Sequence, residues 1–318
     1  MHKAFEKVIL IGYGKIAGQA LSYTADRRKD YGYQIEFVEH EVNPFPVTEK
    51  ICRENDIPFA RIEDKKELAA FFQSISERTL IVSVSNNFLF PGSLVAKENI
   101  TIINFHNALL PGYPGRNAPS WVIFMGEKES GVTWHYVTAG VDEGNIIIQK
   151  KCAVTADMKA YELAGTLMEL AYEAFTECFD AVIQNKADAR AQETGKDRRM
   201  YRSYEIPGDG FFEPTQDAAD IYRLLRSTDY GKNDIFPPVQ TVLEGKKAEV
   251  LRYRKISADR VPEDVLQAIA KQAAENNRAD CKENRAYTYL ADTTESGFLY
   301  FPLDNGNILR IKCRLITP

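Results

Sequence analysis

The feature that most constrains the fold is a series of continuous apolar and β-branched runs in the first third of the chain. They cover residues 8–11, 79–84 and 100–105; a further strand is expected at 34–38, and helix-like segments separate the strands. A strand with one wet face alternates apolar and polar residues, whereas a continuous run suits a strand buried on both faces. Such strands, alternating with helices, predict a wound α/β domain with a mainly parallel sheet.

The pattern changes after residue 105. A loop rich in Gly and Pro spans residues 106–119, a short helix is expected at 120–125, and two strands at 131–137 and 144–152 flank a turn. A long amphipathic helix follows, which Asp157 is expected to cap at its N-terminus. Its apolar residues recur at spacings of three and four: Leu163, Leu167, Leu170, Ala174, Cys178 and Val182.

The last third of the chain has a different organisation. The polar stretch 186–199 predicts a linker, so that the chain divides into domains at residues 1–188 and 200–318. Short strands punctuated by Gly predict a small β-barrel-like second domain. They are expected at residues 241–243, 248–253, 287–290, 297–301 and 308–315, with helices around 217–226 and 262–274.

Charge and hydropathy exclude several classes of protein. The chain carries 40 Lys and Arg against 45 Asp and Glu, a net charge of −5, whereas a non-specific nucleic-acid binder is normally basic. No apolar run approaches the ~18 residues of a membrane span. The first residues lack the long apolar segment of a signal peptide. We therefore expect a cytoplasmic protein with no membrane association.

Cysteine and histidine usage argues against a metal site. The five cysteines form no CxxC pair, and the four histidines form no HExxH motif. We expect free thiols in a reducing compartment and no bound metal.

A glycine-rich turn follows the first strand. Gly12, Gly14 and Gly18 nearly match a dinucleotide fingerprint, with Glu36 or Glu39 where a ribose partner would be sought. The third glycine comes one residue late. The turn geometry of a wound sheet explains these glycines, and nucleotide binding is the alternative.

Three polar residues form the strongest candidate site. Asn104 and His106 lie two positions apart at the carboxyl end of a buried strand, so their side chains face the same side. Asp142 lies on a turn between two later strands. An amide can donate to a developing oxyanion, an imidazole can move a proton, and a carboxylate can orient the imidazole. Taken singly, each residue type is more often structural, so the pattern alone predicts an acid/base site and no particular reaction.

A larger set of motifs carries a family resemblance. They span about 40 residues in this order: Asn104-Phe105-His106, Ala108-Leu109-Leu110-Pro111, Gly115-Arg116, Gly131-Val132-Thr133 and Val141-Asp142-Glu143-Gly144. In order and spacing the chain resembles the formyltransferases of one-carbon metabolism that use N10-formyltetrahydrofolate. The resemblance implies that residues 1–188 form the catalytic domain, of Rossmann-like fold. The segments 221–226 and 229–231 are similar to the small C-terminal barrel of methionyl-tRNA and amino-sugar formyltransferases.

The resemblance also implies roles for single residues. His106 would transfer the proton, Asn104 would donate to the formyl oxygen, and Asp142 would pair with His106. The folate pocket would be lined from four places in the chain. Its residues would be Phe88, Leu89 and Phe90; Ala108, Leu109, Leu110 and Pro111; Arg116; and Thr138, Ala139, Gly140 and Val141.

The amine acceptor is less constrained. Methionyl-tRNA formyltransferases carry a basic loop after the second strand, whereas residues 40–47 here hold no Arg or Lys. We expect a small-molecule amine, first a nucleotide-linked amino sugar, with Arg116, Arg223 and Arg226 as candidate anion contacts. Nucleic acid is not the expected partner, and a homodimer is one candidate oligomeric state. The alternatives are a methionyl-tRNA formyltransferase, a formyltetrahydrofolate hydrolase and a non-catalytic folate-binding protein.

Overall fold

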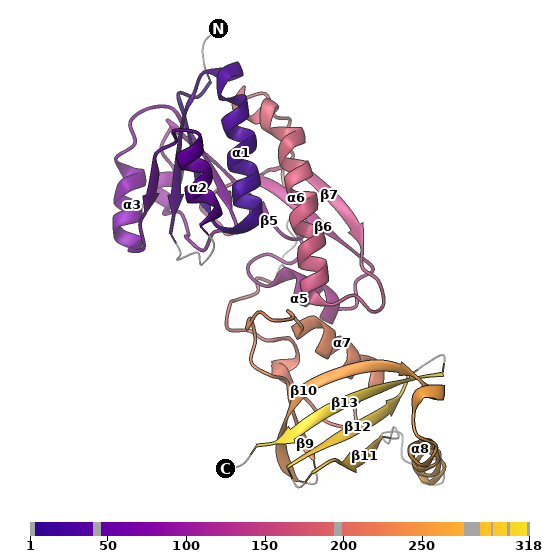
Figure 1. Cartoon of the computed structure of the whole chain (residues 1–318). Coiled ribbons are helices and arrows are strands. Elements are labelled where there is room, and N and C mark those ends of the chain that lie inside the picture. Colours follow the sequence, from indigo (N-terminus) through magenta and orange to yellow (C-terminus); the bar gives the residue numbers. More distant parts are fainter. Residues whose placement is uncertain are drawn as a thin grey trace. The chain divides into compact units, whose positions relative to one another are not determined.

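The computed structural model describes residues 4–40, 46–193, 199–243, 245–276, 287–293, 295–303 and 306–316. The chain forms two compact units (Figure 1). The first comprises Met1–Pro119, Lys128–Val154 and Leu163–Ser203. The second comprises Ser120–Glu127, Thr155–Glu162 and Tyr204–Pro318, so two short segments from the first half of the chain belong to the C-terminal unit.

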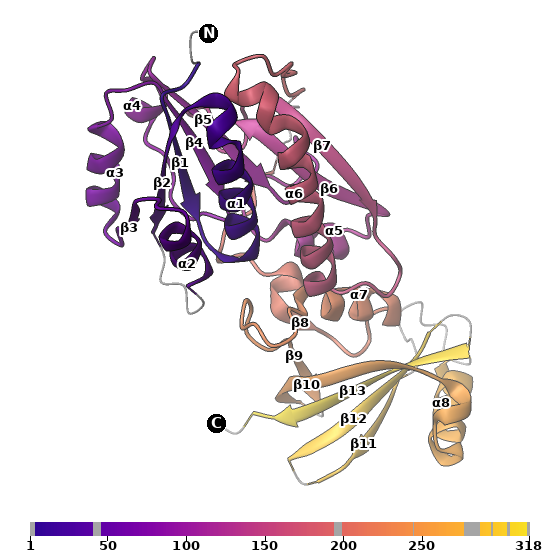
Figure 2. The same ribbon diagram turned by 45° about the horizontal axis from the view of Figure 1, so that its top comes forward.

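The first unit is built around a seven-stranded sheet with the order β3-β2-β1-β4-β5-β6-β7 (Figure 2). Strands β1 to β5 run parallel, and β6 and β7 are antiparallel to their neighbours. This confirms the predicted wound, mainly parallel α/β fold. The elements are β1 (Lys7–Gly12), α1 (Gly14–Tyr31), β2 (Gln34–Glu39), α2 (Val47–Glu54), β3 (Phe59–Arg61), α3 (Lys65–Gln73), β4 (Thr79–Val84), α4 (Gly92–Val95), β5 (Ile100–His106), β6 (Glu129–Tyr136), β7 (Ile146–Ala153) and α6 (Ala160–Ile183). Helix α5 (Ala118–Phe124) belongs for most of its length to the second unit.

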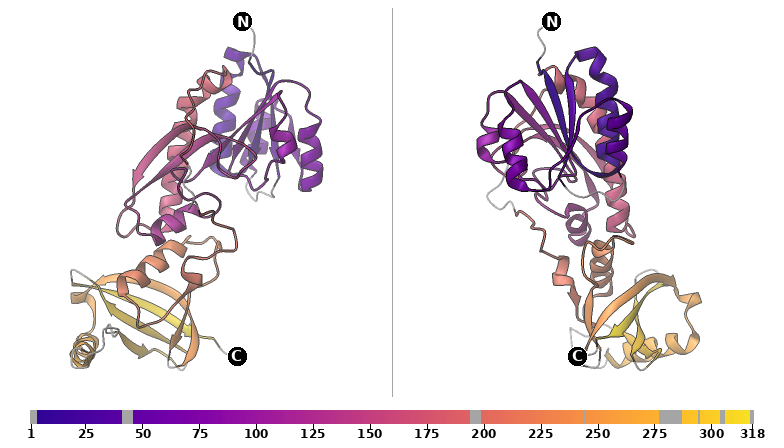
Figure 3. Two further views of the ribbon diagram at one scale, coloured as in Figure 1. Left: turned by 180° about the vertical axis from the view of Figure 1, so that it is seen from behind. Right: turned by 60° about the vertical axis from the view of Figure 1, so that its left-hand side comes forward.

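Helices cover both faces of this sheet, which is why its central strands are apolar throughout (Figure 3). All six residues of β4 are buried. On one face, Leu68 and Phe72 of α3 pack with Ile9 and Ile81 of the sheet. On the other face lie α1 and α6, where the Tyr23 ring meets the Phe175 ring edge-on at 5.9 Å.

Helix α6 is joined to the antiparallel end of the sheet through Trp134 of β6. Its indole is fully buried, donates to the carbonyl of Ala171 at 2.9 Å and lies 5.0 Å from the Phe175 ring. The apolar stripe predicted from the spacing of Leu163 and its companions is therefore the face that closes the core.

The expected N-cap of α6 is wrong. The helix begins at Ala160, and the Asp157 carboxylate instead accepts from Lys255 Nζ at 2.9 Å and from Tyr222. The backbone N–H of Lys159 donates to the Glu162 carboxylate at 2.8 Å, which satisfies one of the free donors at the helix start. Asp64, by contrast, does cap its helix, α3, and accepts from the backbone N–H groups of Lys66 and Glu67. The short elements β3 and α4 carry too little pattern to be predicted.

The second unit contains a six-stranded sheet with the order β11-β12-β13-β10-β9-β8, which forms the predicted barrel-like domain as an open half-barrel. All neighbours are antiparallel except β8 and β9. Its elements are the 3₁₀ turn Pro207–Gly210, β8 (Phe211–Phe212), α7 (Ala218–Thr228), β9 (Gln240–Leu243), β10 (Lys246–Ser257), the 3₁₀ turn Ala258–Arg260, α8 (Glu263–Asn276), β11 (Thr288–Ala291), β12 (Ser296–Pro302) and β13 (Asn307–Leu315).

Each face of the second sheet has its own helix. Ile221, Leu224 and Leu225 of α7 pack on one face with Phe212 and Ile311. Val265 and Ile269 of α8 pack on the other with Tyr300 and Ile308. The helix expected at residues 262–274 is therefore α8; residues 277–286 lie outside the described part of the chain.

Cys52, Cys152, Cys178 and Cys313 are free thiols, and burial raises the pKa of Cys52, Cys178 and Cys313 to about 12. Cys281 lies outside the described residues. Within the described ranges, no three His, Cys, Asp or Glu side chains are grouped to hold a metal ion. No described helix combines the length and hydropathy needed to cross a bilayer.

The packing around Trp134 makes a prediction about stability. Phe175→Ala removes a fully buried ring and should lower the free energy of unfolding by about 3–5 kcal/mol. The chain has two tryptophans, Trp121 in the second unit and Trp134 in the first. Urea titration in a Trp121→Phe background therefore follows the first unit through Trp134 fluorescence. Tyr204→Ala, at a ring that is 75% exposed, is the control and should shift the curve by less than about 0.5 kcal/mol.

Candidate active site

The site begins where the parallel part of the sheet meets its antiparallel part. Asn104 and His106 lie at the carboxyl end of β5, and β6 pairs with the same strand, placing His135 opposite Asn104 and Thr133 opposite His106. Ligands of wound sheets bind at the carboxyl ends of parallel strands. The structure thus brings the predicted amide and imidazole to this edge, together with a second imidazole.

The Asn104 amide has a fixed orientation. Its oxygen accepts from Ser83 Oγ on β4 at 2.8 Å. Its nitrogen therefore points away from β4, lying 3.1 Å from the Phe105 carbonyl and 3.2 Å from His135 Nε2. The side chain is half-buried, so the amide presents N–H donors at the end of the strand.

The His106 imidazole is buried between two partners. Nε2 lies 2.8 Å from the carbonyl of Tyr113; because a carbonyl only accepts, Nε2 carries the proton in this contact. Nδ1 faces Asp142 Oδ2 at 3.5 Å. One ring nitrogen thus faces the carboxylate and the other donates to a main-chain carbonyl, so both contacts fix the orientation of the ring, and the carboxylate favours its protonated form.

Asp142 lies on the turn between β6 and β7, in the left-handed region at φ +53°. Besides His106, its carboxylate accepts from the Gly115 N–H at 2.8 Å and lies 3.5 Å from His135 Nε2. Burial alone would raise the pKa of Asp142, but the two imidazoles and the Gly115 N–H together lower the pKa well below its usual range. The carboxylate is therefore an anion at neutral pH.

His135 is the residue of this cluster that the sequence analysis missed. Its ring is 2% exposed, Nδ1 donates to the Tyr136 carbonyl at 2.8 Å, and Nε2 faces both Asn104 and Asp142. The sequence does show a histidine on the strand expected at 131–137. That position points to the site only once β6 is known to pair with β5.

The segment 108–111, predicted to line a folate pocket, is anchored from β6 and β7. Thr133 Oγ1 donates to the Ala108 carbonyl and accepts from the Leu110 N–H, and Gln149 Nε2 donates to the Leu110 carbonyl at 2.9 Å. Ala108 and Leu110 are buried, whereas Leu109 and Pro111 are half-buried. Only the latter two therefore present side-chain surface to a ligand.

The turn and loop residues predicted for the same pocket differ in exposure. Thr138, Ala139 and Arg116 are exposed, whereas Gly140 and Val141 are half-buried. A Cβ on Gly140 would lie 1.9 Å from Glu143 Oε2, so the turn closes on itself at that glycine.

The aromatic segment 88–90 lies after β4. Phe88 is 6% exposed and packs against Phe72 and the ring of His40. Leu89 is 74% exposed and Phe90 is half-buried. Phe88 thus contributes to the core, and Leu89 is the member of the segment most open to a ligand.

The glycine-rich first turn has a steric explanation. A Cβ on Gly12 would lie 1.7 Å from the carbonyl oxygen of Val84, so the close approach of β1 and β4 requires glycine. Neither candidate ribose partner is available. Glu39 is fully buried and accepts from Arg61 and Thr48, and Glu36 lies 2.6 Å from Lys7 Nζ.

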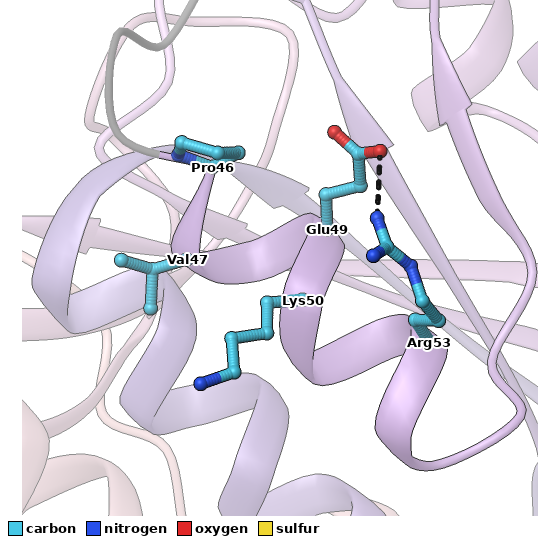
Figure 4. Close-up of a pocket in the computed structure, with 5 residues that line it drawn as sticks. All are labelled: Pro46, Val47, Glu49, Lys50 and Arg53. Carbon is cyan, nitrogen blue, oxygen red and sulfur yellow. Dashed lines mark hydrogen bonds and ion pairs between the residues drawn. The ribbon is translucent and has the colours of Figure 1, made fainter.

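Two open hollows lie elsewhere on the first unit. One, of about 440 Å³, is lined by residues of α2, among them Glu49 and Arg53, which form an ion pair (Figure 4). The other, of about 480 Å³, lies among α1, α2 and Tyr172 of α6. Neither includes a residue of the polar cluster, so the chemistry is not placed in them. Arg226 in the second unit is also not placed to meet a ligand, because it is 8% exposed and donates to the Met158 carbonyl.

The sequence and the fold both have relatives. Residues 35–179 match the family described as formyl transferase. Methionyl-tRNA formyltransferase of Alkaliphilus oremlandii is 30% identical over 180 residues, 57% of this chain and 56% of the relative, so the match spans little more than half of that protein. GDP-perosamine N-formyltransferase of Brucella melitensis is 26% identical over 196 residues, 62% of this chain and 73% of the relative.

Solved structures share the fold over almost the whole chain. WlaRD, a sugar 3N-formyl transferase solved in the presence of dTDP and 5-N-formyl-THF, superposes with a TM-score of 0.62 at 15% identity, covering 99% of both chains. The N-formyltransferase from Helicobacter canadensis, solved with folinic acid and dTDP-3-aminofucose, gives 0.63 at 13% identity, covering 98% of this chain and 100% of that one. Residues 35–179 therefore form a formyl transferase domain, and the chain as a whole shares the fold of the solved sugar N-formyltransferases.

Proposed function

We propose that the protein transfers the formyl group of N10-formyltetrahydrofolate to a primary amine, with a nucleotide-linked amino sugar as the preferred acceptor. The observation that carries the proposal is the convergence of the Asn104 amide, the His106 imidazole and the Asp142 carboxylate at the end of β5. In a formyltransferase domain, this set supplies an oxyanion donor and an oriented acid/base.

The amine attacks the formyl carbon and a tetrahedral intermediate forms. Its oxygen gains charge, which the Asn104 Nδ2–H groups stabilise because Ser83 already holds the amide oxygen. His106 exchanges the proton between the attacking amine and the leaving nitrogen of tetrahydrofolate. Asp142, ionised at neutral pH, stabilises the imidazolium that forms in between.

The surroundings of the cluster suit a formyl-folate. Leu109 and Pro111 supply half-buried apolar surface, and the turn 138–141 supplies main-chain polar groups for a pteridine, whose edge both donates and accepts. Gly131 makes room for Leu109, since a Cβ there would lie 2.6 Å from Leu109 Cδ2. Leu109, Pro111 and the turn residues from 138 to 141 are therefore proposed as the folate-binding residues, with Arg116 and Leu89 at the exposed margin.

The choice of a nucleotide-linked amino sugar has two supports. One relative is named for GDP-perosamine, and two structural neighbours were solved with dTDP or a dTDP-amino sugar. In this chain, residues 40–47 provide no Arg or Lys to hold an RNA backbone; residues 41–45 of that loop lie outside the described part of the chain. The free thiols Cys52, Cys152, Cys178 and Cys313 support a cytoplasmic location.

Turnover with a panel of acceptors tests this function. The purified chain is incubated with N10-formyltetrahydrofolate alone and with amino sugars linked to dTDP, GDP or UDP, or with methionyl-tRNA, and products are identified by mass spectrometry. Formylation of an amino sugar is the expected result. Formylation of methionyl-tRNA alone would show that tRNA, and not an amino sugar, is the acceptor. Formate release without an acceptor would indicate a hydrolase. Folate binding without turnover would contradict the enzymatic assignment.

Removal of the oxyanion donor should abolish most of the activity. Asn104→Ala should lower kcat by about 10²- to 10³-fold, because the charge on the formyl oxygen loses its donor. The measurement is initial-rate kinetics with the acceptor identified from the panel. Asn233→Ala, at an exposed asparagine of the second unit, is the matched control and should leave kcat unchanged. Equal rates for the two variants would contradict the role of Asn104.

The lowered pKa of Asp142 predicts how stability depends on pH. The native pKa lies below the unfolded value of about 3.9, so the stability that the carboxylate contributes is fully present above that pH. Asp142→Asn should therefore reduce the free energy of unfolding at pH 7 by about 1.5–3 kcal/mol. The difference from wild type should shrink as the pH falls below about 4.

Urea unfolding across this pH range measures the effect. Asp188→Asn, at an exposed carboxylate, is the control and should change stability little at any pH. A difference between wild type and Asp142→Asn that stays constant down to about pH 2 would contradict an ionised native carboxylate.

A further inference from the structure

The stretch predicted from sequence to be a plain linker makes specific contacts with the site. Arg190 forms an antiparallel bridge with Ile146 at the start of β7, through N–H to carbonyl bonds of 2.8 and 2.9 Å. Its guanidinium donates to Gln149 Oε1, and Gln149 in turn donates to the Leu110 carbonyl. The chain leaving α6 is thus held against the turn that carries Asp142.

Gln192, two residues further on, contacts that turn directly. Its Nε2 donates to the Asp142 carbonyl at 2.9 Å and to the Gly144 carbonyl at 2.7 Å. A primary amide nitrogen has two hydrogens, so one group satisfies both carbonyls. Both acceptors are main-chain oxygens, which determines that the nitrogen and not the oxygen of the amide faces the turn.

The turn needs such a restraint. Asp142 has φ +53°, a conformation that costs a non-glycine residue about 1 kcal/mol or more. Gly144 closes against β6, where a Cβ would lie 1.7 Å from the Tyr136 carbonyl oxygen. The Gln192 amide spans this strained stretch from Asp142 to Gly144. The amide oxygen of Gln192 is buried and has no hydrogen-bond partner among the described residues.

Tyr201, further along the chain, holds the loop of Gly115, whose N–H donates to the Asp142 carboxylate. The Arg116 N–H donates to the Tyr201 carbonyl at 2.9 Å, and the Tyr201 N–H donates to the Pro114 carbonyl at 3.0 Å. Between them lies Gly115, whose N–H donates to the Asp142 carboxylate and whose Cβ, if present, would lie 2.2 Å from the Tyr201 oxygen. The turn that carries Asp142 is therefore held by Gln192, and the Gly115 N–H that donates to the Asp142 carboxylate is held in place by Tyr201.

We infer that Gln192 is a positioning residue for the formyl-transfer reaction, which holds the Asp142 turn so that the carboxylate faces His106. The expected effect on kcat rests on the proposed function. The effect on the position of the Asp142 turn rests only on the hydrogen bonds of Gln192. Gln192 touches neither His106 nor a reacting atom; it acts through the main chain of Asp142 and Gly144.

The kinetic test compares Gln192→Ala and Gln192→Glu with Gln184→Ala in the full chain, using the acceptor found in the panel. Gln184 is an exposed glutamine whose Nε2 also donates to one main-chain carbonyl, that of Asp180 at 3.0 Å, and it lies outside the site. Both Gln192 variants should lower kcat by about 10- to 100-fold, since a small misplacement of a catalytic group is this costly. KM for the formyl donor and Tm should stay close to those of the control. A kcat equal to that of the control, or a parallel loss of Tm and rise of KM, would overturn the inference.

A second readout does not depend on turnover. The proton NMR signals of the His106 ring are followed against pH in wild type and in Gln192→Ala, which introduces no charge. Asp142 and Tyr113 are the groups that face this ring, and His135 adjoins the same carboxylate. Loss of a correctly placed carboxylate should move the His106 titration to lower pH. An unchanged titration would overturn the inference, whereas a shifted titration in a chain that formylates no acceptor would uphold it and remove the proposed function instead.

Discussion

The site depends on one buried anion. The Asp142 carboxylate, 11% exposed, is stabilised by the Gly115 N–H and by two imidazoles, and each of these partners comes from a different part of the chain. A buried carboxylate without such partners would take up a proton, because burial disfavours the charged form. The antiparallel addition of β6 and β7 to a parallel sheet is what brings these partners together, since it places His135 beside Asn104 and the Asp142 turn beyond them.

The same geometry explains how the surrounding glycines and loops are used. Gly115, Gly131 and Gly144 stand where another main chain or side chain approaches too closely for a Cβ. Thr133 and Gln149 satisfy the polar main-chain groups of Ala108 and Leu110, so that this segment stays ordered while Leu109 and Pro111 remain available to a ligand. The chemistry of the site therefore rests on packing and hydrogen bonding between strands.

The second unit shows what a family resemblance transfers and what it does not. Its barrel-like sheet was expected from short strands and α8 from the helical pattern at residues 262–274, but the apolar contacts of α8 with Tyr300 and Ile308 were not expected. Arg226 was interpreted as an anion contact. Burial lowers the pKa of Arg226, however, and its guanidinium donates a hydrogen bond to the Met158 carbonyl. A charged residue in a motif can belong to the interior when a main-chain acceptor is within reach.

Sequence by itself determined the elements whose signals are local. The continuous apolar runs of β1, β4 and β5 and the pair Asn104 and His106 at the end of β5 were readable, because periodicity and spacing act within a few residues. The family motifs added the pairing of Asp142 with His106. Only the tertiary structure decided which groups touch. Strand pairing places His135 in the site, and the polar stretch after α6 returns to the Asp142 turn, where Gln192 binds it. Asp157 does not cap α6 and instead pairs with Lys255. Such contacts join residues far apart in the chain, and no local pattern records them.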